Sequence, residues 1–329
     1  MPELTLEELI AALRAAPAWQ RKREIEVLAG ELIASAPLIE GRPVLVGDDA
    51  AALDTGEDYL LLAAEVMYPP LVRADPYLAG KYAILTNVND IYAMGGYPLA
   101  LVDVILATGM EEAAAILRGL RDGCARYDVA LVGGHLTATG DTTSVAACIL
   151  GRAKRLLSSF EVQPGDILLH AANLQGQFHP QFRFWNCSAH LSGADLRRDL
   201  AILPTIAEAG WCKAARDVSM GGLFGSILML LELSGLGAVI DLETVPQPVG
   251  IEDRYLDWLL AFPSYGFVLA VSPEHVAAVQ AAFAAREITC AAIGQATVNR
   301  QVVLRQNHRV ATLWDLATKP FIGFSLPSA

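Results

Sequence analysis

The chain has 329 residues and a mass of 35.2 kDa, a length that predicts about two domains. Apolar residues make up 53% of the chain, charged residues make up 18%, and the formal net charge is −12. This composition excludes disordered, fibrous and low-complexity proteins. The acidic charge excludes a protein that binds polymeric nucleic acid through its phosphates, but it does not exclude one that binds a single nucleotide.

Nothing in the sequence predicts export or membrane insertion. No run of about 18–20 apolar residues is present, and residues 1–13 carry three glutamates where a signal peptide would carry positive charge. The five cysteines are widely spaced and form no CxxC pair, which predicts neither a disulfide framework nor a structural zinc site. We therefore expect a cytoplasmic protein without a membrane span.

The first half of the chain alternates between helical and strand patterns. The first helix starts with a capping box, Thr5 and Glu8, and the third ends at Gly95 and Gly96. We expect helices over residues 6–13, 19–35, 77–94 and 111–127, and strands over 43–46, 59–66, 99–107, 129–132 and 144–153.

The polar segment 158–165 predicts a linker, because it is marked by Pro164 and Gly165. It divides the chain into domains over 1–157 and 158–329. In the second domain we expect strands over 166–171, 237–241, 265–271 and 289–304, and helices over 194–209, 221–233 and 273–285. Mixed strands and helices predict an α/β (α+β) fold with two domains.

The first motif with chemical potential is Gly-Asp-Asp-Ala-Ala at 47–51, directly after a predicted strand. Two adjacent carboxylates, Asp48 and Asp49, on a turn of small residues can meet a hard cation such as Mg²⁺, which prefers oxygen ligands and bridges to phosphates. The alternative is a solvated turn without a ligand.

The second motif lies in the predicted helix over 77–94. Asn87 and Asp90 are three residues apart and share one helical face, although the helix is otherwise apolar. A buried carboxylate needs a partner. A metal ion or a hydrogen-bond donor would serve, and the alternative is a hydrogen bond to the helix backbone.

Two further motifs place glycine pairs beside polar side chains. Gly133 and Gly134, followed by His135, end a predicted strand and offer backbone amides to an anion, with Asp141 and several threonines close by. No GxxxxGK[ST] or GxGxxG pattern is present. Asp217 and Ser219 precede a Gly-rich helix start, where they either cap the helix or help its amides to bind an anion.

These four segments, in this order, resemble the aminoimidazole ribonucleotide (AIR) synthase superfamily, which includes thiamine-monophosphate kinase and selenophosphate synthetase. The most specific piece is Asn-Asp-Ile-Tyr-Ala-Met-Gly-Gly at 89–96. The resemblance implies two α/β domains and a homodimer in which N-domain strands form a barrel. It also implies an enzyme that binds ATP with Mg²⁺ and phosphorylates an oxygen of a small-molecule substrate.

The resemblance further implies roles for individual residues. The implied metal ligands are Asp48, Asp49, Glu65 and Asp90. The implied nucleotide-binding residues are Gly47, Asn87, Gly133, Gly134, Asp141, Asp217 and Ser219, and the implied catalytic residues are Asp49, Asp90 and His135.

The sequence also departs from the well-known members. Glu65 stands where the family usually has Asp, and His135 resembles the selenophosphate synthetase pattern. Residues 1–40 lack the reactive cysteine of that enzyme, and residues 323–329 lack the terminal cysteine of the hydrogenase-maturation member. We therefore expect an AIR synthase-related orphan. The alternatives are a thiamine-monophosphate kinase-like phosphotransferase and a catalytically silent nucleotide-binding regulatory protein.

The segment 173–192 is unusually aromatic and polar. Arg183 can grip an anion with two hydrogen bonds, and the aromatic rings can stack on a substrate ring. The candidate substrate-binding residues are His179, Arg183, Trp185 and His190, and Cys187 lies among them. The alternative is a dimer contact or a lid that packs on the C-terminal domain.

Overall fold

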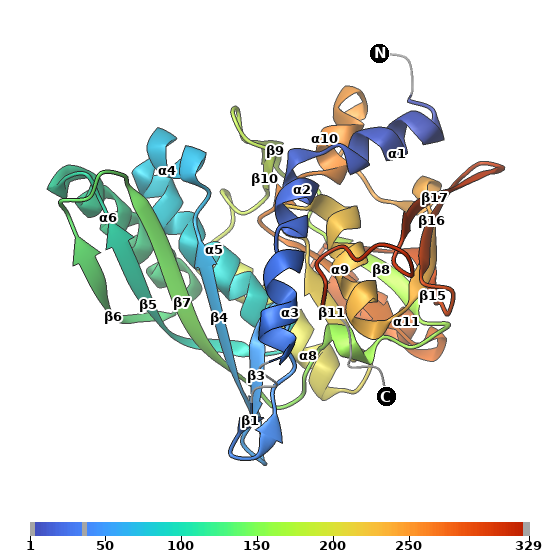
Figure 1. Ribbon diagram of the computed structural model, residues 1–329, viewed down its shortest axis with the longest axis horizontal. Coiled ribbons are helices and arrows are strands. Elements are labelled where there is room, and N and C mark those ends of the chain that lie inside the picture. Colours follow the sequence, from blue (N-terminus) through green and yellow to red (C-terminus); the bar gives the residue numbers. More distant parts are fainter. Residues whose placement is uncertain (1–3, 35–37, 325–329) are drawn as a thin grey trace. The chain divides into compact units, whose positions relative to one another are not determined.

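The computed structural model (Figure 1) describes residues 4–34 and 38–324. Their contacts divide the chain into two units. Unit 1 takes residues 1–48, 157–189 and 206–329, and unit 2 takes residues 49–156 and 190–205. The division differs from the expected domains in two places: residues 1–48 group with the C-terminal half of the chain, and residues 190–205 group with the N-terminal half.

Unit 2 is built on a five-stranded sheet in the order β3-β4-β7-β5-β6. The β5–β6 pair is parallel and the other pairs are antiparallel. The strands are β3 (Ala51–Asp54), β4 (Tyr59–Val66), β5 (Tyr97–Leu106), β6 (Ala130–Thr137) and β7 (Ser144–Ala153). The helices are α4 (Pro69–Ala74), α5 (Pro76–Ala93), α6 (Met110–Tyr127) and α7 (Gly193–Leu200).

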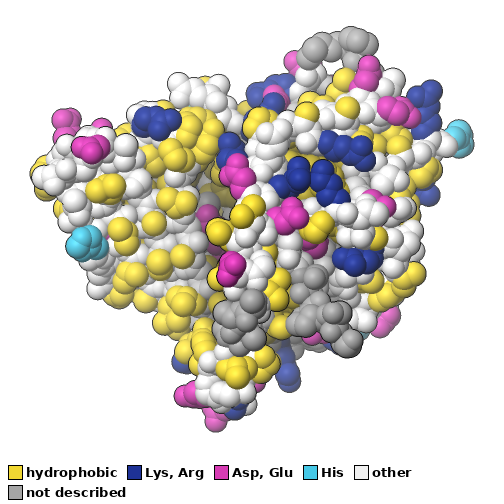
Figure 2. All heavy atoms as spheres, viewed as in Figure 1, with side chains coloured by type: hydrophobic (Ala, Val, Ile, Leu, Met, Phe, Trp, Pro, Cys, Tyr) yellow, Lys and Arg dark blue, Asp and Glu magenta, His cyan; other side chains and the backbone are white. Residues whose placement is uncertain are grey.

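The two faces of this sheet differ. Alternate residues on β4 and β7, such as Leu61 and Ile149, are fully buried and face α5. The opposite side chains are apolar but exposed: Leu62, Val66, Val102 and Val104 have exposed fractions of 51%, 65%, 41% and 49%. Figure 2 shows hydrophobic side chains gathered over these strands, with few charged groups between them.

Unit 1 contains a seven-stranded sheet in the order β11-β14-β8-β15-β12-β16-β17. The strands are β8 (Ile167–Ala172), β11 (Ala214–Asp217), β12 (Gly237–Asp241), β14 (Gly266–Val271), β15 (Thr289–Thr297), β16 (Gln301–Gln306) and β17 (Arg309–Asp315). Its helices include α9 (Gly222–Ser234), α10 (Tyr255–Leu259) and α11 (Val276–Ala284), and the boundary between the units falls within α8 (Ile202–Glu208). Nearly every residue of α9 is buried, in keeping with its largely apolar sequence, and the buried set includes Ser226 and Glu232.

The N-terminal helices α1 (Leu6–Arg14), α2 (Pro17–Arg23) and α3 (Glu26–Ala34) belong to unit 1. Trp19 is buried and donates a 2.8 Å hydrogen bond from Nε1 to the carbonyl of Gly221. Its ring meets Trp314 and Phe321 edge-on, at centroid distances of 5.9 and 5.3 Å. This aromatic cluster is why residues 1–48 pack with the C-terminal half.

Two smaller sheets complete unit 1. One is a hairpin of β1 (Leu38–Ile39) and β2 (Arg42–Pro43), and the other has the order β13-β10-β9. Its strands are β9 (Gln177–Phe178), β10 (Phe184–Asn186) and β13 (Phe262–Pro263). Short 3₁₀ helices include η1 (Ser159–Glu161) and η3 (Glu252–Arg254).

The expected elements are largely present, with four corrections. The strand expected over 43–46 is wrong, since β3 begins after the aspartate pair. Strand β6 does not end at Gly133 but runs through both glycines to Thr137. The helices expected over 19–35 and 194–209 are each two helices, α2 and α3 in the first case and α7 and α8 in the second. Within the described parts of the chain, no helix is both long and apolar enough to cross a membrane.

Candidate functional site

The adjacent residues Asp48 and Asp49 have different surroundings. The Asp48 side chain is 3% exposed, and its Oδ2 accepts hydrogen bonds of 2.8 Å from Ser158 Oγ and from the backbone N–H of Ser159. Its Oδ1 accepts a 2.6 Å bond from Ser159 Oγ and lies 3.6 Å from Arg216 Nη1. Asp48 is therefore the acceptor of a buried, charge-paired network.

Asp49 is half-buried and lies two residues before β3 in unit 2. Glu65 is half-buried near the end of β4, and Asp90 is 6% exposed on α5. Residues 4–34 and 38–324 include no group of three or more His, Cys, Asp or Glu side chains that could hold a metal ion. Any ion held by these carboxylates would therefore take other ligands from phosphate and water, as Mg²⁺ usually does.

The polar face of α5 was predicted to need partners. Asn87 Nδ2 donates a 2.8 Å hydrogen bond to the carbonyl of Ala83, which confirms the backbone alternative for the amide nitrogen. The Oδ1 atoms of Asn87 and Asn89 are buried and accept no hydrogen bond within the described structure. Buried acceptors without donors are rare, and the amide oxygen of Asn87, which shares a helical face with Asp90, suits a hard cation or its bound water.

Gly133, Gly134 and His135 lie within β6, an edge strand of the unit 2 sheet. All three are exposed, and the His135 ring nitrogen Nε2 lies 3.5 Å from Thr137 Oγ1. Among the described strands, none pairs with the outer edge of β6, which leaves backbone groups open on that side. Position 134 has no room for a larger residue, since a Cβ there would lie 2.3 Å from Oδ1 of Asp103 on the neighbouring strand β5.

The loop that follows β6 is held by a glutamate that the sequence patterns did not single out. Glu112, in the first turn of α6, accepts a 2.6 Å hydrogen bond from Thr108 Oγ1 and a second bond from Thr143 Oγ1. These bonds keep the pKa of Glu112 below its usual value. Asp141 is exposed in this loop. Glu112 and Thr143 are 31 residues apart in the chain, so no local motif could reveal that they are bonded.

Asp217 and Ser219 lie where β11 connects to α9. Asp217 ends β11 and is 4% exposed, whereas the backbone N–H of Ser219 donates a 3.1 Å hydrogen bond to Ser226 Oγ. The N-cap of α9 is Gly221, with no side-chain cap. Neither Asp217 nor Ser219 is therefore the N-cap of α9.

The aromatic segment 173–192 packs inward. Trp185 is 3% exposed, and its ring meets Phe178 at 5.1 Å and Trp258 at 5.6 Å. Its Nε1 donates a 3.1 Å bond to the carbonyl of Asn173. The predicted stacking of Trp185 on a substrate conflicts with this burial, because its ring already packs in the core of unit 1.

Other residues of this segment are exposed. Arg183 is half exposed and pairs with Asp257 at 2.8 Å, while Arg254 reaches the other oxygen of Asp257 at 3.1 Å. His190 is exposed in unit 2, and His179 Nδ1 accepts a 3.1 Å bond from the N–H of Gln181. Cys187 is buried, with its Sγ 3.1 Å from Ser264 Oγ. This thiol is therefore part of the packed interior of unit 1.

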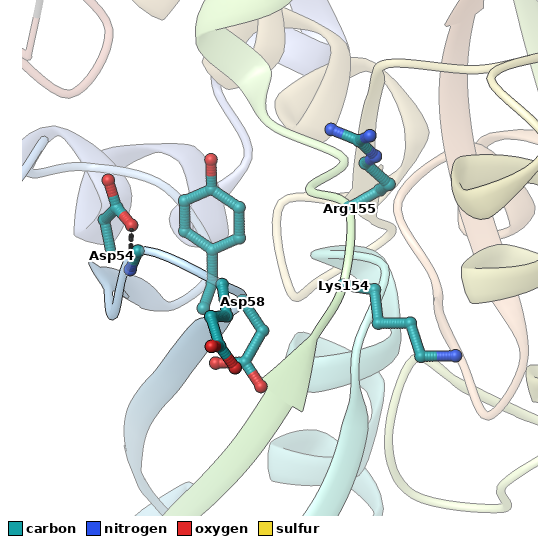
Figure 3. A pocket seen from close by; sticks show the side chains of 7 residues that line it. Asp54, Asp58, Lys154 and Arg155 are labelled. Carbon is teal, nitrogen blue, oxygen red and sulfur yellow. Dashed lines mark hydrogen bonds between the residues drawn. The ribbon is translucent and has the colours of Figure 1, made fainter.

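A hollow of about 370 Å³ opens beside the β3–β4 turn in unit 2. Figure 3 shows Asp54 and Asp58 on one side of it and Lys154 and Arg155 on the other. The Asp54 carboxylate accepts a 2.7 Å hydrogen bond from the N–H of Gly56. None of the predicted site residues lines this hollow, so its charges do not belong to the motifs described above.

Sequence comparisons give relatives along nearly the whole chain. An uncharacterized protein of Synechocystis sp. is 38% identical over 97% of this chain and 99% of its own length. The selenide, water dikinase of Colwellia psychrerythraea is 29% identical over 64% of this chain and 63% of its own length.

Solved structures share the fold at low sequence identity. PurL of Thermotoga maritima, solved with ADP, has a TM-score of 0.72 at 14% identity and covers 95% of this chain, which spans 53% of the PurL chain. AaThiL, solved with AMPPCP and TMP, has a TM-score of 0.64 at 16% identity over 88% of this chain and 96% of its own.

Two family profiles match this chain, one in each half. Residues 47–153 match the profile described as AIR synthase related protein, N-terminal domain. Residues 186–306 match the C-terminal domain of the same family. Together they cover more than half of the chain and contain all four motifs, and so the chain belongs to the AIR synthase related protein family.

Proposed function

We propose that this protein is an ATP- and Mg²⁺-dependent enzyme that phosphorylates an oxygen atom of a small-molecule substrate. The observation that carries the proposal is helix α5, where Asp90 is 6% exposed and where the buried Oδ1 atoms of Asn87 and Asn89 accept no hydrogen bond within the described structure. Relatives support it, because they include a selenide, water dikinase and structural neighbours solved with ADP or AMPPCP.

The residues present fit Mg²⁺, since they offer carboxylate and amide oxygens. Asp49, Glu65 and Asp90 would hold the ion, with Asn87 supporting its water ligands. When bound, Mg²⁺ would neutralise charge on the phosphate oxygens. Because the protein itself has a net charge of −12, ATP would depend on such cations to approach these carboxylates.

The edge strand β6 is the proposed phosphate-binding element. Its exposed Gly133 and Gly134 leave room for phosphate oxygens beside the backbone, and His135 would lie at the transferred group. Asp141, Asp217 and Ser219 remain proposed nucleotide contacts. The exposed Arg183 and His190 and the half-buried His179 remain proposed contacts for the substrate.

We also propose a cytoplasmic homodimer. The exposed apolar face of β4, β7 and β5 runs across the sheet of unit 2, and such a contiguous face is typical of an interface. A second copy of the same face would cover these valines and leucines around a twofold axis.

Calorimetric titration with Mg²⁺ and AMPPCP tests the proposal. We expect the wild type to bind AMPPCP with Mg²⁺. Asp49→Asn and Asp90→Asn should each weaken this binding about 10-fold or more, a loss of at least about 1.4 kcal/mol of binding free energy. Asp253→Asn, at an exposed position on η3, is the matched control and should bind as the wild type does. Absence of wild-type binding, or equal binding by all variants, would refute the metal assignment.

Activity separates the alternatives. Phosphate release from ATP that rises with one member of a substrate panel supports an enzyme, and thiamine monophosphate in that panel tests the kinase-like alternative. Tight nucleotide binding without stimulated hydrolysis by any substrate favours a regulatory nucleotide-binding protein instead.

A further inference from the structure

The buried network around Asp48 assigns different tasks to the two adjacent aspartates, and this inference rests on the proposed function above. Asp48 accepts three hydrogen bonds from Ser158 and Ser159 and lies beside Arg216. A carboxylate has two oxygens with about four acceptor positions, so protein donors already take most of them. A metal ion at Asp48 would have to displace these buried donors, which is costly.

Arg216 ties the network to the turn itself. It extends from β11, its side chain is 7% exposed, and Nη1 lies 3.4 Å from the carbonyl of Gly47 and 3.4 Å from Ser159 Oγ. Gly47 has a φ of +120°, a conformation that favours glycine. One guanidinium therefore holds the backbone before Asp48, the Asp48 carboxylate and the serine that binds it.

Packing closes the other side of the turn. A Cβ on Gly47 would lie 2.7 Å from the Phe324 ring and 3.0 Å from a Leu233 methyl group. Ser234 Oγ donates to the carbonyl of Ser159, and the N–H of Ser158 donates to the carbonyl of Lys213. The turn is thus fixed by β11, η1, α9 and the segment that contains Phe324, all within unit 1.

The chain also leaves and re-enters unit 1 at this network. Unit 2 starts at Asp49 and its first segment ends at Leu156, so Asp48 and Ser158 flank the two crossing points. Their hydrogen bond joins them although they are 110 residues apart. The Asp48 network therefore lies at the point where the chain passes from unit 1 into unit 2, directly before Asp49.

We propose that Asp48 is a structural anchor and not a metal ligand, and that Arg216 and Ser159 are positioning residues that present Asp49 to Mg²⁺. The pair of acidic residues then works as one anchor and one ligand. Arg216, which the sequence motifs did not single out, acts on nucleotide binding through Asp48 and the backbone of Gly47.

The experiment combines thermal unfolding with electron paramagnetic resonance of Mn²⁺ in the presence of AMPPCP. We expect Asp48→Asn to lower the Tm by about 5–10 °C, because it disrupts a buried charge network. It should weaken Mn²⁺ binding about 10-fold, the scale of a residue behind the ligands, with the number of bound ions unchanged. Asp49→Asn should abolish one Mn²⁺ site and leave the Tm equal or higher.

Arg216 provides the rescue test. Arg216→Met should lower both Tm and Mn²⁺ affinity, while Arg216→Lys should recover part of both, since it keeps a cation beside Asp48. Asp241→Asn is the matched control: it breaks the 2.7 Å ion pair of Asp241 with Arg305 elsewhere in unit 1 and should not change Mn²⁺ binding. If Asp48→Asn does not fold, Ser159→Ala, which removes one donor, replaces it with the same expected signs.

Loss of a Mn²⁺ site in Asp48→Asn at unchanged Tm would overturn the anchor, as would an Arg216→Met protein that matches the wild type in both measurements. If the wild type binds no Mn²⁺ with AMPPCP, the proposed function fails. The Tm arm then still decides whether Asp48 is an anchor.

Discussion

At the scale of single residues, burial decides which polar groups are available for chemistry. His170 illustrates this in the middle of β8, where it is 2% exposed and its ring lies 6.2 Å from that of Trp258. Its Nδ1 has no hydrogen-bond partner within the described structure. Burial lowers the pKa of His170 to about 4, so the folded protein keeps this ring neutral at neutral pH.

This pKa predicts a pH dependence of stability. Unfolded chains bind a proton at His170 below about pH 6.5, whereas the folded chain does so only near pH 4. Stability is therefore lost as the pH falls through that window, by about 3 kcal/mol at 1.4 kcal/mol per pKa unit. The free energy of unfolding, measured in urea, should fall between pH 7 and pH 4 in both proteins. The fall should be larger in the wild type than in His170→Leu by about this amount. Equal losses would contradict the prediction.

At the scale of elements, glycines decide how closely α5 and α6 approach. A Cβ at Gly119 would lie 2.0 Å from the carbonyl oxygen of Tyr77, and one at Gly80 would lie 2.2 Å from that of Ile116. The helices therefore meet backbone to backbone, which keeps α5 and its Asp90 in a fixed position against the sheet. The sequence correctly predicted both helices. It could not predict that these glycines contact the other helix, because the contacting residues are far apart in the chain.

We expect Gly119→Ala to lower the unfolding free energy by about 2–4 kcal/mol, because the added methyl group overlaps backbone that can move only with the whole helix. Gly109→Ala is the control, since a Cβ there meets nothing within 4 Å and its φ of −171° is accessible to any residue. Urea unfolding of both variants gives the comparison, and a Gly119→Ala protein as stable as the control would refute the close approach.

At the scale of the whole molecule, the exposed apolar face of the unit 2 sheet is the feature that a single chain leaves unexplained. Val102 and Val104 of β5 lie beside β6, whose Val132 is 64% exposed. Because side chains alternate between the two faces of a strand, burial against α5 requires only one face of this sheet to be apolar. That the second face is apolar as well supports the proposed dimer.

Light scattering during gel filtration tests this surface. We expect the wild type to elute with twice the chain mass of 35.2 kDa and the double variant Val102→Glu/Val132→Glu to elute as a single chain, because charges cannot be buried unpaired in an apolar interface. Val310→Glu, at an exposed valine of β17 in unit 1, should keep the wild-type mass. A monomeric wild type, or a double variant of unchanged mass, would rule out this interface.

Local sequence determined much of this protein. The repeat of apolar residues located most helices and strands, and the motifs at 47–51 and 89–96 indicated the family before any contact was known. These signals are readable because helix and strand periods, turn residues and short motifs depend on residues a few positions apart.

Tertiary structure alone decided what the motif residues do. Asp48 and Asp49 are adjacent residues of the same type, and the sequence does not distinguish their roles. In the structure, Asp48 accepts a hydrogen bond from a serine 111 residues away. Trp185 was expected to meet a substrate but is buried against Trp258, and residues 1–48 pack with the C-terminal half through Trp19. Burial and pairing arise from contacts between distant segments, which no local pattern records.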